Sequence, residues 1–274
     1  MNEFWTKEKL GKHPQVAETA ARLFKEYAIC SSEQLLARLQ ESVYKFGNVA
    51  PIAWKDLLTK ANLDDCLRQE YVTEALKVTT AQPAIGKGEF LLVSLFSNIG
   101  FTKDHGDLID LTTKKRAEVK GIFSAICNGY SDTYRQLTAE LLRAIFAKYK
   151  MTPPAKLDKQ ACKSLEQFAL KSDADLRYIL TECRNTSMTH IPVINSAMSS
   201  FRSRSQPDLL LTIAGMHLYD YLKLENSQYF IAVNDKQFEC FVAPQNVYQA
   251  VEILKHFSID GWQIGKRGVT ITLK

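Results

Sequence analysis

Several common signatures are missing from this sequence of 274 residues. Its six cysteines include no C-x-x-C pair, which argues against a zinc ribbon or a dithiol redox motif. The longest strongly apolar run, at about residues 90–95, is far shorter than the roughly 20 residues of a membrane-spanning helix. We also find no internal repeat and no low-complexity tract. These absences leave a globular protein, long enough for one large domain or two modest ones.

A secretory signal is also missing, so we expect the cysteines to be free thiols in a reducing compartment. The composition, 46% hydrophobic and 24% charged, is typical of a soluble globular protein. The formal net charge of +5 permits binding to nucleic acid without requiring it. We therefore expect the protein to be cytoplasmic or to lie within a viral particle.

The first 80 residues predict a helical region. Apolar residues recur at helical spacing from Val16 to Tyr27, and Ser31 followed by Gln34 predicts a capping box at the start of a second helix. We interpret the region as a helical cap on a catalytic domain that comprises residues 81–274. A small helix-turn-helix-like DNA-reading module is the alternative, although no recognition helix is marked. The Pro83 segment is a credible boundary.

A predicted hairpin follows this boundary. Residues 107–111 and 116–121 have the pattern of two strands, joined by the polar loop of residues 112–115. Because side chains alternate along a strand, Glu118 and Lys120 share one face. If Leu111 pairs with Arg116, Asp107 lies opposite Lys120 on that same face. A slip of one residue would bring Asp110 there instead, so Asp110 is held as the alternative to Asp107.

Glu89 begins an apolar helix at residues 90–99, where we expect its carboxylate to reach the end of the hairpin. Carboxylate oxygens are the ligands that Mg²⁺ prefers, and it binds through one or two acids together with substrate phosphates. A metal bound by Asp107 and Glu118 would polarise a phosphodiester and supply a hydroxide nucleophile.

The ordered set of Glu89 on a helix, Asp107 on a strand and Glu118-Val119-Lys120 on the next strand resembles the PD-(D/E)XK superfamily of restriction-endonuclease-like nucleases. The resemblance covers residues 86–121 and implies that Asp107 and Glu118 bind the metal. It implies that Lys120 steadies the attacking water or the scissile phosphate, and that Glu89 adds to the metal shell. One departure is that Gly106, rather than proline, precedes Asp107.

The remainder of the chain completes the expected architecture, a mixed α/β fold with a restriction-endonuclease-like core. Residues 132–206 predict a mostly helical insertion, of which the polar stretch 195–206 has the composition of a loop. After it we expect a helix at residues 209–224, strands at 229–233 and 238–243, a helix at 246–257 and a final hairpin at 262–273. These strands are expected to complete the sheet of the catalytic hairpin.

Basic residues cluster at predicted turns and loops, where they are candidates for contacts with DNA phosphates. Such contacts give affinity and salt dependence but carry no sequence information. The candidates are Lys114, Lys115, Arg116, Arg202, Arg204, Lys266 and Arg267.

Three functional hypotheses follow. The first is an Mg²⁺- or Mn²⁺-dependent nuclease that hydrolyses phosphodiester bonds in DNA, expected to be double-stranded. The second is a non-cleaving DNA-binding protein of the same fold, for example a viral particle protein that binds and protects DNA ends. The third is an assembly protein whose carboxylates only fix loops. The sequence leaves the oligomeric state open.

Overall fold

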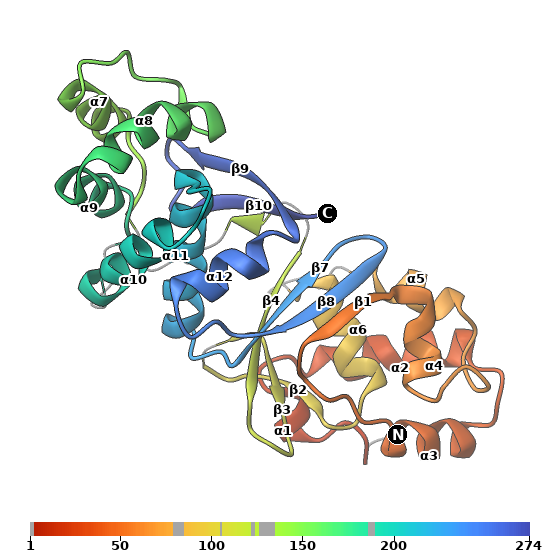
Figure 1. Cartoon of the computed structure of the whole chain (residues 1–274). Coiled ribbons are helices and arrows are strands. Elements are labelled where there is room, and N and C mark those ends of the chain that lie inside the picture. The colour runs from red at the N-terminus through yellow and green to blue at the C-terminus, as the bar shows by residue number, and fades with distance from the viewer. Residues whose placement is uncertain (1–2, 79–84, 105, 122–123, 126–134, 186–189) are drawn as a thin grey trace. The chain divides into compact units, whose positions relative to one another are not determined.

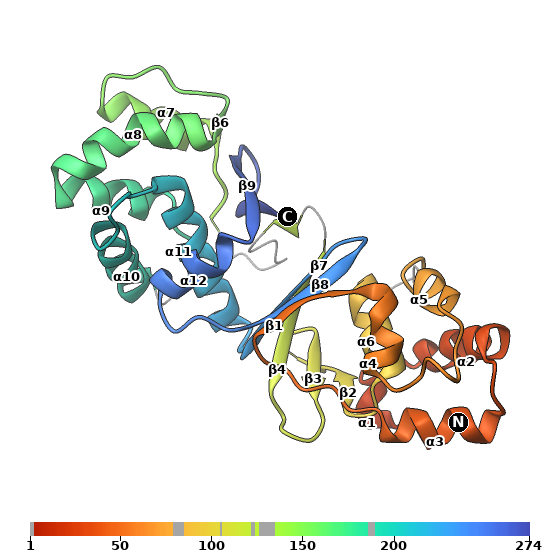
Figure 2. The same cartoon turned by 45° about the vertical axis from the view of Figure 1, so that its right-hand side comes forward.

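The computed structural model describes residues 3–78, 85–104, 106–121, 124–125, 135–185 and 190–274. The chain divides into two compact units, shown in Figures 1 and 2. Unit 1 comprises residues 1–121 and 225–242, and unit 2 comprises residues 122–224 and 243–274. The expected boundary at residues 80–81 lies outside the described residues, and the helices before it belong to the same unit as the predicted hairpin.

Unit 1 is built on a six-stranded sheet in the order β1-β8-β7-β4-β3-β2. Neighbouring strands are antiparallel, except that β4 and β7 are parallel. The strands are β1 (Val49–Ala53), β2 (Ile99–Phe101), β3 (Leu108–Asp110), β4 (Arg116–Lys120), β7 (Tyr229–Val233) and β8 (Gln237–Val242).

Helices cover one face of this sheet and bury its apolar side chains (Figure 2). Val119, Ile231 and Phe238 from the sheet join the same core as Phe90, Leu91 and the other apolar residues of α6. From Phe90 to Leu95 every residue of α6 is buried in this core, and all of them except Ser94 are apolar. The helical elements are α1 (Lys7–Leu10), α2 (Gln15–Tyr27), α3 (Ser32–Glu41), the 3₁₀ turn η1 (Trp54–Asp56), α4 (Leu57–Lys60), α5 (Glu70–Ala75) and α6 (Lys87–Leu95).

Unit 2 combines helices with a second sheet in the order β5-β10-β9-β6. Its longest helix, α11, packs against α12, α10 and α8. The helices are α7 (Ala139–Lys148), α8 (Lys159–Lys171), α9 (Asp173–Glu182), α10 (His190–Arg202), α11 (Leu209–Leu224) and α12 (Val247–Leu254), and the strands are β5 (Ser124–Ala125), β6 (Lys156–Leu157), β9 (Phe257–Gln263) and β10 (Val269–Leu273).

The mixed α/β class is confirmed, but three details differ from the sequence prediction. The N-terminal region contributes an edge strand, β1, which the sequence did not suggest because Pro51 interrupts its pattern. The stretch predicted as a loop at residues 195–206 continues α10 as far as Arg202. The final hairpin, β9–β10, joins the second sheet and does not complete the first. The predicted start of the insertion, at residue 132, lies outside the described residues.

The predicted hairpin, β3–β4, forms with a register two residues away from the predicted one. Leu108 pairs with Ala117 and Ile109 with Arg116, so Leu111 does not pair with Arg116 as expected. Continuing this register places Asp107 opposite Glu118, and not opposite Lys120. Since side chains alternate with a period of two, the shift leaves Asp107 on the predicted face.

No helix among the described residues is both long and apolar enough to cross a membrane.

Candidate active site

Asp107 and Glu118 meet at the open end of the β3–β4 hairpin. The backbone N–H of Asp107 donates to the carbonyl of Ala117 at 3.1 Å, and Asp107 Oδ2 accepts from the N–H of Val119 at 2.8 Å. The side chains of Asp107 and Glu118 also interact, and this interaction lowers the pKa of Asp107. Glu118 is buried, with 3% of its surface exposed. The hairpin therefore holds two acidic side chains against each other in a largely dry environment.

Lys120 completes this cluster from the same strand. Its Nζ lies 2.5 Å from Glu118 Oε1, and 23% of its side chain is exposed. Burial lowers the pKa of Lys120, but attraction to Glu118, and then to Asp107, outweighs burial and raises the pKa overall. Lys120 is therefore a firmly protonated cation within reach of two acids.

Glu89 approaches the cluster from the first turn of α6. Burial, followed by repulsion from Asp107, raises its pKa to about 8, although a hydrogen bond with the backbone of Gly86 opposes the shift. A methyl group added at Gly86 would lie 2.3 Å from Glu89 Oε1, so glycine provides the room for this carboxylate. Gly88, one residue before Glu89, permits a similar approach of the helix to Val233 on β7. The helix start thus places a carboxyl beside the hairpin, where it is protonated at neutral pH.

The turn before Asp107 is fixed by several contacts. Gly106 has a φ of +73°, a conformation that glycine adopts without strain. Its carbonyl accepts a short hydrogen bond from Thr102 Oγ1. Its N–H donates to Glu225 Oε2 at 3.4 Å. The residue before Asp107 has a positive φ, which proline cannot adopt, so glycine fits this turn where proline would not.

Glu225 is a site neighbour that the sequence analysis missed. It lies 119 positions from Gly106 in the chain, and no motif links the two. Burial is the largest cause that raises the pKa of Asp107, and repulsion from Glu225 adds to it, against the lowering effects of Lys120 and the Val119 N–H. The acidic surroundings of Asp107 therefore include Glu225, which belongs to unit 1 although residues 122–224 of unit 2 separate the two in the sequence.

Asp110, the alternative to Asp107, has a different role. Its Oδ1 accepts from the backbone N–H of Thr112 at 2.9 Å and from Asn98 Nδ2 at 3.3 Å, and its Oδ2 accepts from Thr113 Oγ1 at 2.8 Å. These contacts close the hairpin turn and attach it to the segment before β2. The hydrogen bonds of Asp110 thus stabilise the turn, and the acid beside Glu118 is Asp107.

The donor set suits a hard divalent cation. Glu89 and Asp107 both have a raised pKa because acidic groups are buried close together, and a cation would relieve this repulsion. As the side chains lie, however, no group of three or more Asp, Glu, His or Cys residues in the described part of the chain forms a ready metal cage. A site with two protein carboxylates, completed by waters and phosphate oxygens, matches the way Mg²⁺ binds.

The predicted DNA-binding residues are divided between the two units. In unit 1, Lys114 pairs with Glu8 at 2.6 Å, Lys115 donates to the Tyr229 hydroxyl at 3.2 Å, and the backbone N–H of Arg116 donates to Gln228. All three lie at the β3–β4 turn or the start of β4, on the hairpin that carries Asp107 and Glu118.

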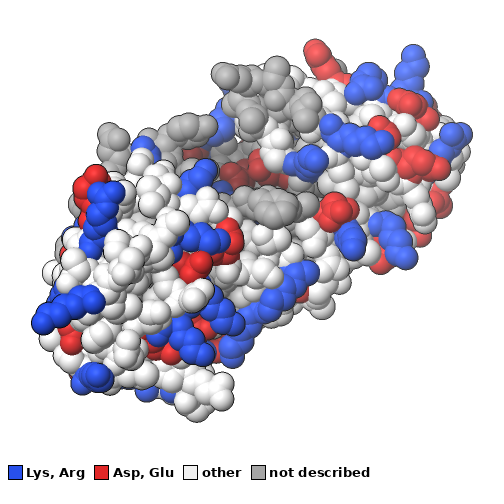
Figure 3. All heavy atoms as spheres, turned by 90° about the horizontal axis from the view of Figure 1, so that it is seen from above, with Lys and Arg blue, Asp and Glu red and all other residues white. Residues whose placement is uncertain are grey.

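In unit 2, Arg202 pairs with Asp173 and Arg204 with Glu252, each at 2.9 Å. Only 11% of the Arg204 side chain is exposed, and its guanidinium stacks over Tyr248. Lys266 is exposed in the turn between β9 and β10, and the neighbouring Arg267 is half-buried. On the face in Figure 3 the described Lys and Arg side chains are interspersed with Asp and Glu and form no single basic field.

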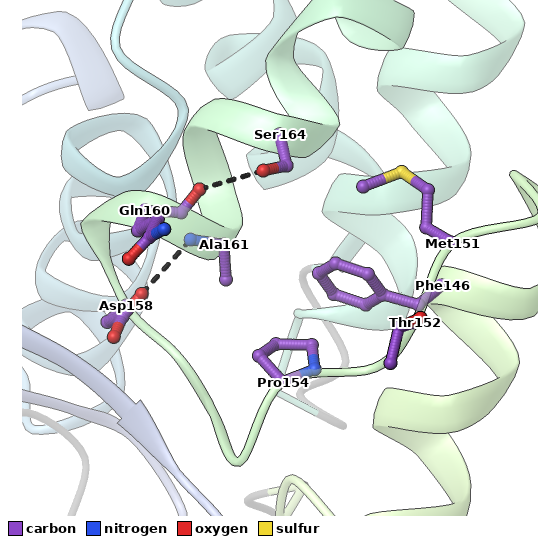
Figure 4. A pocket seen from close by; sticks show the side chains of 8 residues that line it. All are labelled: Phe146, Met151, Thr152, Pro154, Asp158, Gln160, Ala161 and Ser164. Carbon is purple, nitrogen blue, oxygen red and sulfur yellow. Dashed lines mark hydrogen bonds between the residues drawn. The ribbon is translucent and has the colours of Figure 1, made fainter.

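A pocket of about 480 Å³ lies between the end of α7 and the start of α8 (Figure 4). Two of its polar side chains make hydrogen bonds to the backbone of α8. Asp158 Oδ1 accepts from the N–H of Ala161 at 3.0 Å, and the Ser164 hydroxyl donates to the Gln160 carbonyl at 3.1 Å. None of the predicted site residues lines it, and we assign it no chemistry. The lining residues are Phe146, Met151, Thr152, Pro154, Asp158, Gln160, Ala161 and Ser164.

Comparison with known proteins gives no relative to guide the assignment. No protein-family model matches the sequence, and no curated protein or solved structure matches the chain. A function for this protein is therefore inferred from the geometry of the site.

Proposed function

We propose that the protein is an Mg²⁺- or Mn²⁺-dependent DNA nuclease of restriction-endonuclease-like fold. The supporting observation is the placement of Asp107, Glu118 and Lys120 on one hairpin, with Lys120 Nζ 2.5 Å from Glu118 and Glu89 beside them. The order of elements also fits: helix α6 is followed by the antiparallel strands β2, β3 and β4, and then by β7 parallel to β4.

Each residue of the site would have a different role in the reaction. Asp107 and Glu118 would hold the metal, which when bound supplies Lewis acidity toward the phosphate and a more acidic water. The Val119 N–H keeps the Asp107 carboxylate in place while Glu118 extends from the neighbouring strand. The hairpin thereby fixes the two ligands before substrate arrives.

Lys120 provides positive charge where the reaction needs it. Its raised pKa keeps it protonated at neutral pH, so it can stabilise the negative charge that develops on the phosphate. In the structure that charge is balanced by Glu118, and substrate phosphate would compete for the same cation. Glu89, with a pKa near 8, releases its proton when positive charge enters the site.

The test is incubation of purified protein with plasmid and linear duplex DNA, at low salt, with EDTA or with millimolar Mg²⁺ or Mn²⁺. Metal-dependent cleavage is the expected result. Binding of DNA without cleavage in either metal would instead favour a DNA-end-binding protein, and neither binding nor cleavage would leave the carboxylates with a structural role. The Asp104→Asn variant is a matched control, because Asp104 is an exposed acid three residues before Asp107.

A further inference from the structure

Two cysteines from distant parts of unit 1 lie side by side. The segment after α2 meets the segment before α5 in a short antiparallel bridge between Ala28 and Leu67. The N–H of Ile29 donates to the carbonyl of Cys66 at 2.9 Å. On the other side of the bridge, the N–H of Arg68 donates to the carbonyl of Tyr27, also at 2.9 Å. This backbone pairing fixes the distance between Cys30 and Cys66.

The two cysteines lie close together. Cys30 Sγ donates to the carbonyl oxygen of Cys66 at 3.8 Å. Burial, and then the Cys30 thiol, raise the pKa of Cys66 to about 12. Both cysteines are free thiols, and they differ in access: Cys30 is half-buried, whereas Cys66 is 3% exposed.

The other described cysteines lack this combination of a partner and access. Cys162, Cys183 and Cys240 are each buried, with at most 1% of the surface exposed. A small oxidant can therefore reach Cys30 before it reaches any of these three. Among the described cysteines, the Cys30–Cys66 pair has both an accessible first thiol and a second cysteine close to it.

We propose that Cys30 and Cys66 form a reversible disulfide by exchange with a low-molecular-weight disulfide such as glutathione disulfide. The Cys30 thiolate, having lost its proton to solvent, attacks one sulfur of the small disulfide and releases one small thiolate. The Cys66 thiolate then attacks the Cys30 sulfur of the mixed disulfide and releases the second. The protein pair loses two electrons and two protons, and the small disulfide is reduced to two thiols.

The second step sets the rate of the exchange. Because the Cys66 thiol resists ionisation, little thiolate is present at neutral pH, and ring closure should accelerate as the pH rises. The closeness of the two cysteines compensates in part, since the attacking group is already near its target. The mixed disulfide on Cys30 should therefore accumulate before the internal bond forms.

The disulfide would connect two helices that both support α6. Residue 30 follows the end of α2, residue 66 precedes α5, and both helices pack against α6, the helix that carries Glu89. Closing the chain between positions 30 and 66 restricts the unfolded state, so the oxidised protein should melt at a higher temperature, by about 5 °C or more.

The experiment is oxidation of the native full-length protein with glutathione disulfide, followed by peptide mapping under non-reducing conditions. We expect a Cys30–Cys66 peptide, faster formation at pH 9 than at pH 7, and a melting-temperature rise that dithiothreitol reverses. The Cys66→Ala variant should stop at one glutathione adduct on Cys30, and Cys30→Ala should take none on Cys66. Cys240→Ala, a buried cysteine of β8, should oxidise as the wild type does.

Three results would overturn the proposal. One is a wild type that stays fully reduced, and another is a bridge from Cys30 to any other cysteine, Cys127 included. The third is a Cys66→Ala variant that takes no adduct on Cys30. None of these readouts involves nuclease activity, so the two proposals fail separately.

Discussion

Asp107 Oδ2 accepts a hydrogen bond from the Val119 N–H at 2.8 Å, which holds the Asp107 carboxyl group beside Glu118 on β4. Two acids in a buried position repel each other once both are ionised. Lys120 offsets part of this repulsion by its ion pair with Glu118. The raised pKa of Glu89 means that its carboxyl group keeps a proton and adds no further negative charge at neutral pH. Added positive charge should therefore relieve the repulsion among these acids.

The raised pKa of Glu89 should appear in the pH dependence of stability. The folded-state pKa is about 8 and the ordinary value is 4.5, so the folded protein binds this proton more tightly than the unfolded chain. The stabilisation is complete below about pH 4.5 and is lost as the pH rises through 8. Glu89→Gln should flatten this slope and make the variant more stable than wild type at pH 9, by on the order of 2 kcal/mol.

Urea denaturation at pH 5, 7 and 9 measures this difference. The matched control is Glu70→Gln, since Glu70 is an exposed glutamate in the first turn of α5. That variant should follow the wild type at every pH. Parallel curves for wild type and Glu89→Gln would show that Glu89 is ionised and solvated in the folded protein.

Gly86→Ala should separate activity from stability. The new methyl group would meet the Glu89 carboxylate at 2.3 Å, and a flexible carboxylate can move away without disturbing the fold. We expect cleavage to fall about 10-fold or more, with a melting temperature within a few degrees of wild type. Gly47→Ala, where an added methyl group has open space, should leave both unchanged. Full activity in Gly86→Ala would argue that the position of Glu89 is unimportant.

Asp110→Ala should destabilise the protein without acting on the proposed metal site. The substitution removes the acceptor for Thr112, Thr113 and Asn98, and each lost buried hydrogen bond costs about 1 kcal/mol. We expect a loss of about 2–3 kcal/mol by urea denaturation and unchanged metal dependence of the remaining activity. Asp110→Asn keeps one carbonyl oxygen and should lose less. A change in metal affinity with normal stability would return Asp110 to the list of ligands.

The basic residues should differ in whether they contribute to DNA affinity or to the stability of the fold. Lys266 is exposed, and if it contacts a phosphate, Lys266→Gln should lower the slope of log affinity against log salt by about one. Arg204 is largely buried against Glu252 and Tyr248, so Arg204→Gln should lower the melting temperature and leave the salt slope unchanged. Fluorescence anisotropy with duplex DNA between 50 and about 200 mM salt distinguishes the two. Equal slopes for wild type and Lys266→Gln would remove Lys266 from the interface.

The local structure of unit 1 could be predicted from the sequence, because it depends on near neighbours. The capping box of Ser31 and Gln34 is present as expected, and the hairpin strands lie within two residues of their predicted bounds. The register could not be predicted, because it is set by Asp110. By accepting hydrogen bonds from Thr112 and Thr113, that residue turns the chain earlier than the polar loop at residues 112–115 suggested.

Long-range features had no local signal. Glu225 reaches Gly106 from another part of the chain, and β1 pairs with β8 despite Pro51 because an edge strand tolerates proline. The polar composition of residues 195–206 suggested a loop. The helix α10 nevertheless continues to Arg202, and Ser200 and Phe201 near its end are buried. Composition describes how polar a segment is, whereas burial depends on what the rest of the chain places beside it.

The most direct test of the catalytic assignment compares DNA cleavage by wild type, Glu118→Gln and Lys120→Ala, purified separately and assayed together in Mg²⁺ and in EDTA. The account predicts cleavage by wild type in Mg²⁺ only, and a loss of at least about 100-fold in both variants with DNA affinity largely retained. Equal cleavage by all three proteins would contradict it, because the activity would then come from somewhere other than Glu118 and Lys120.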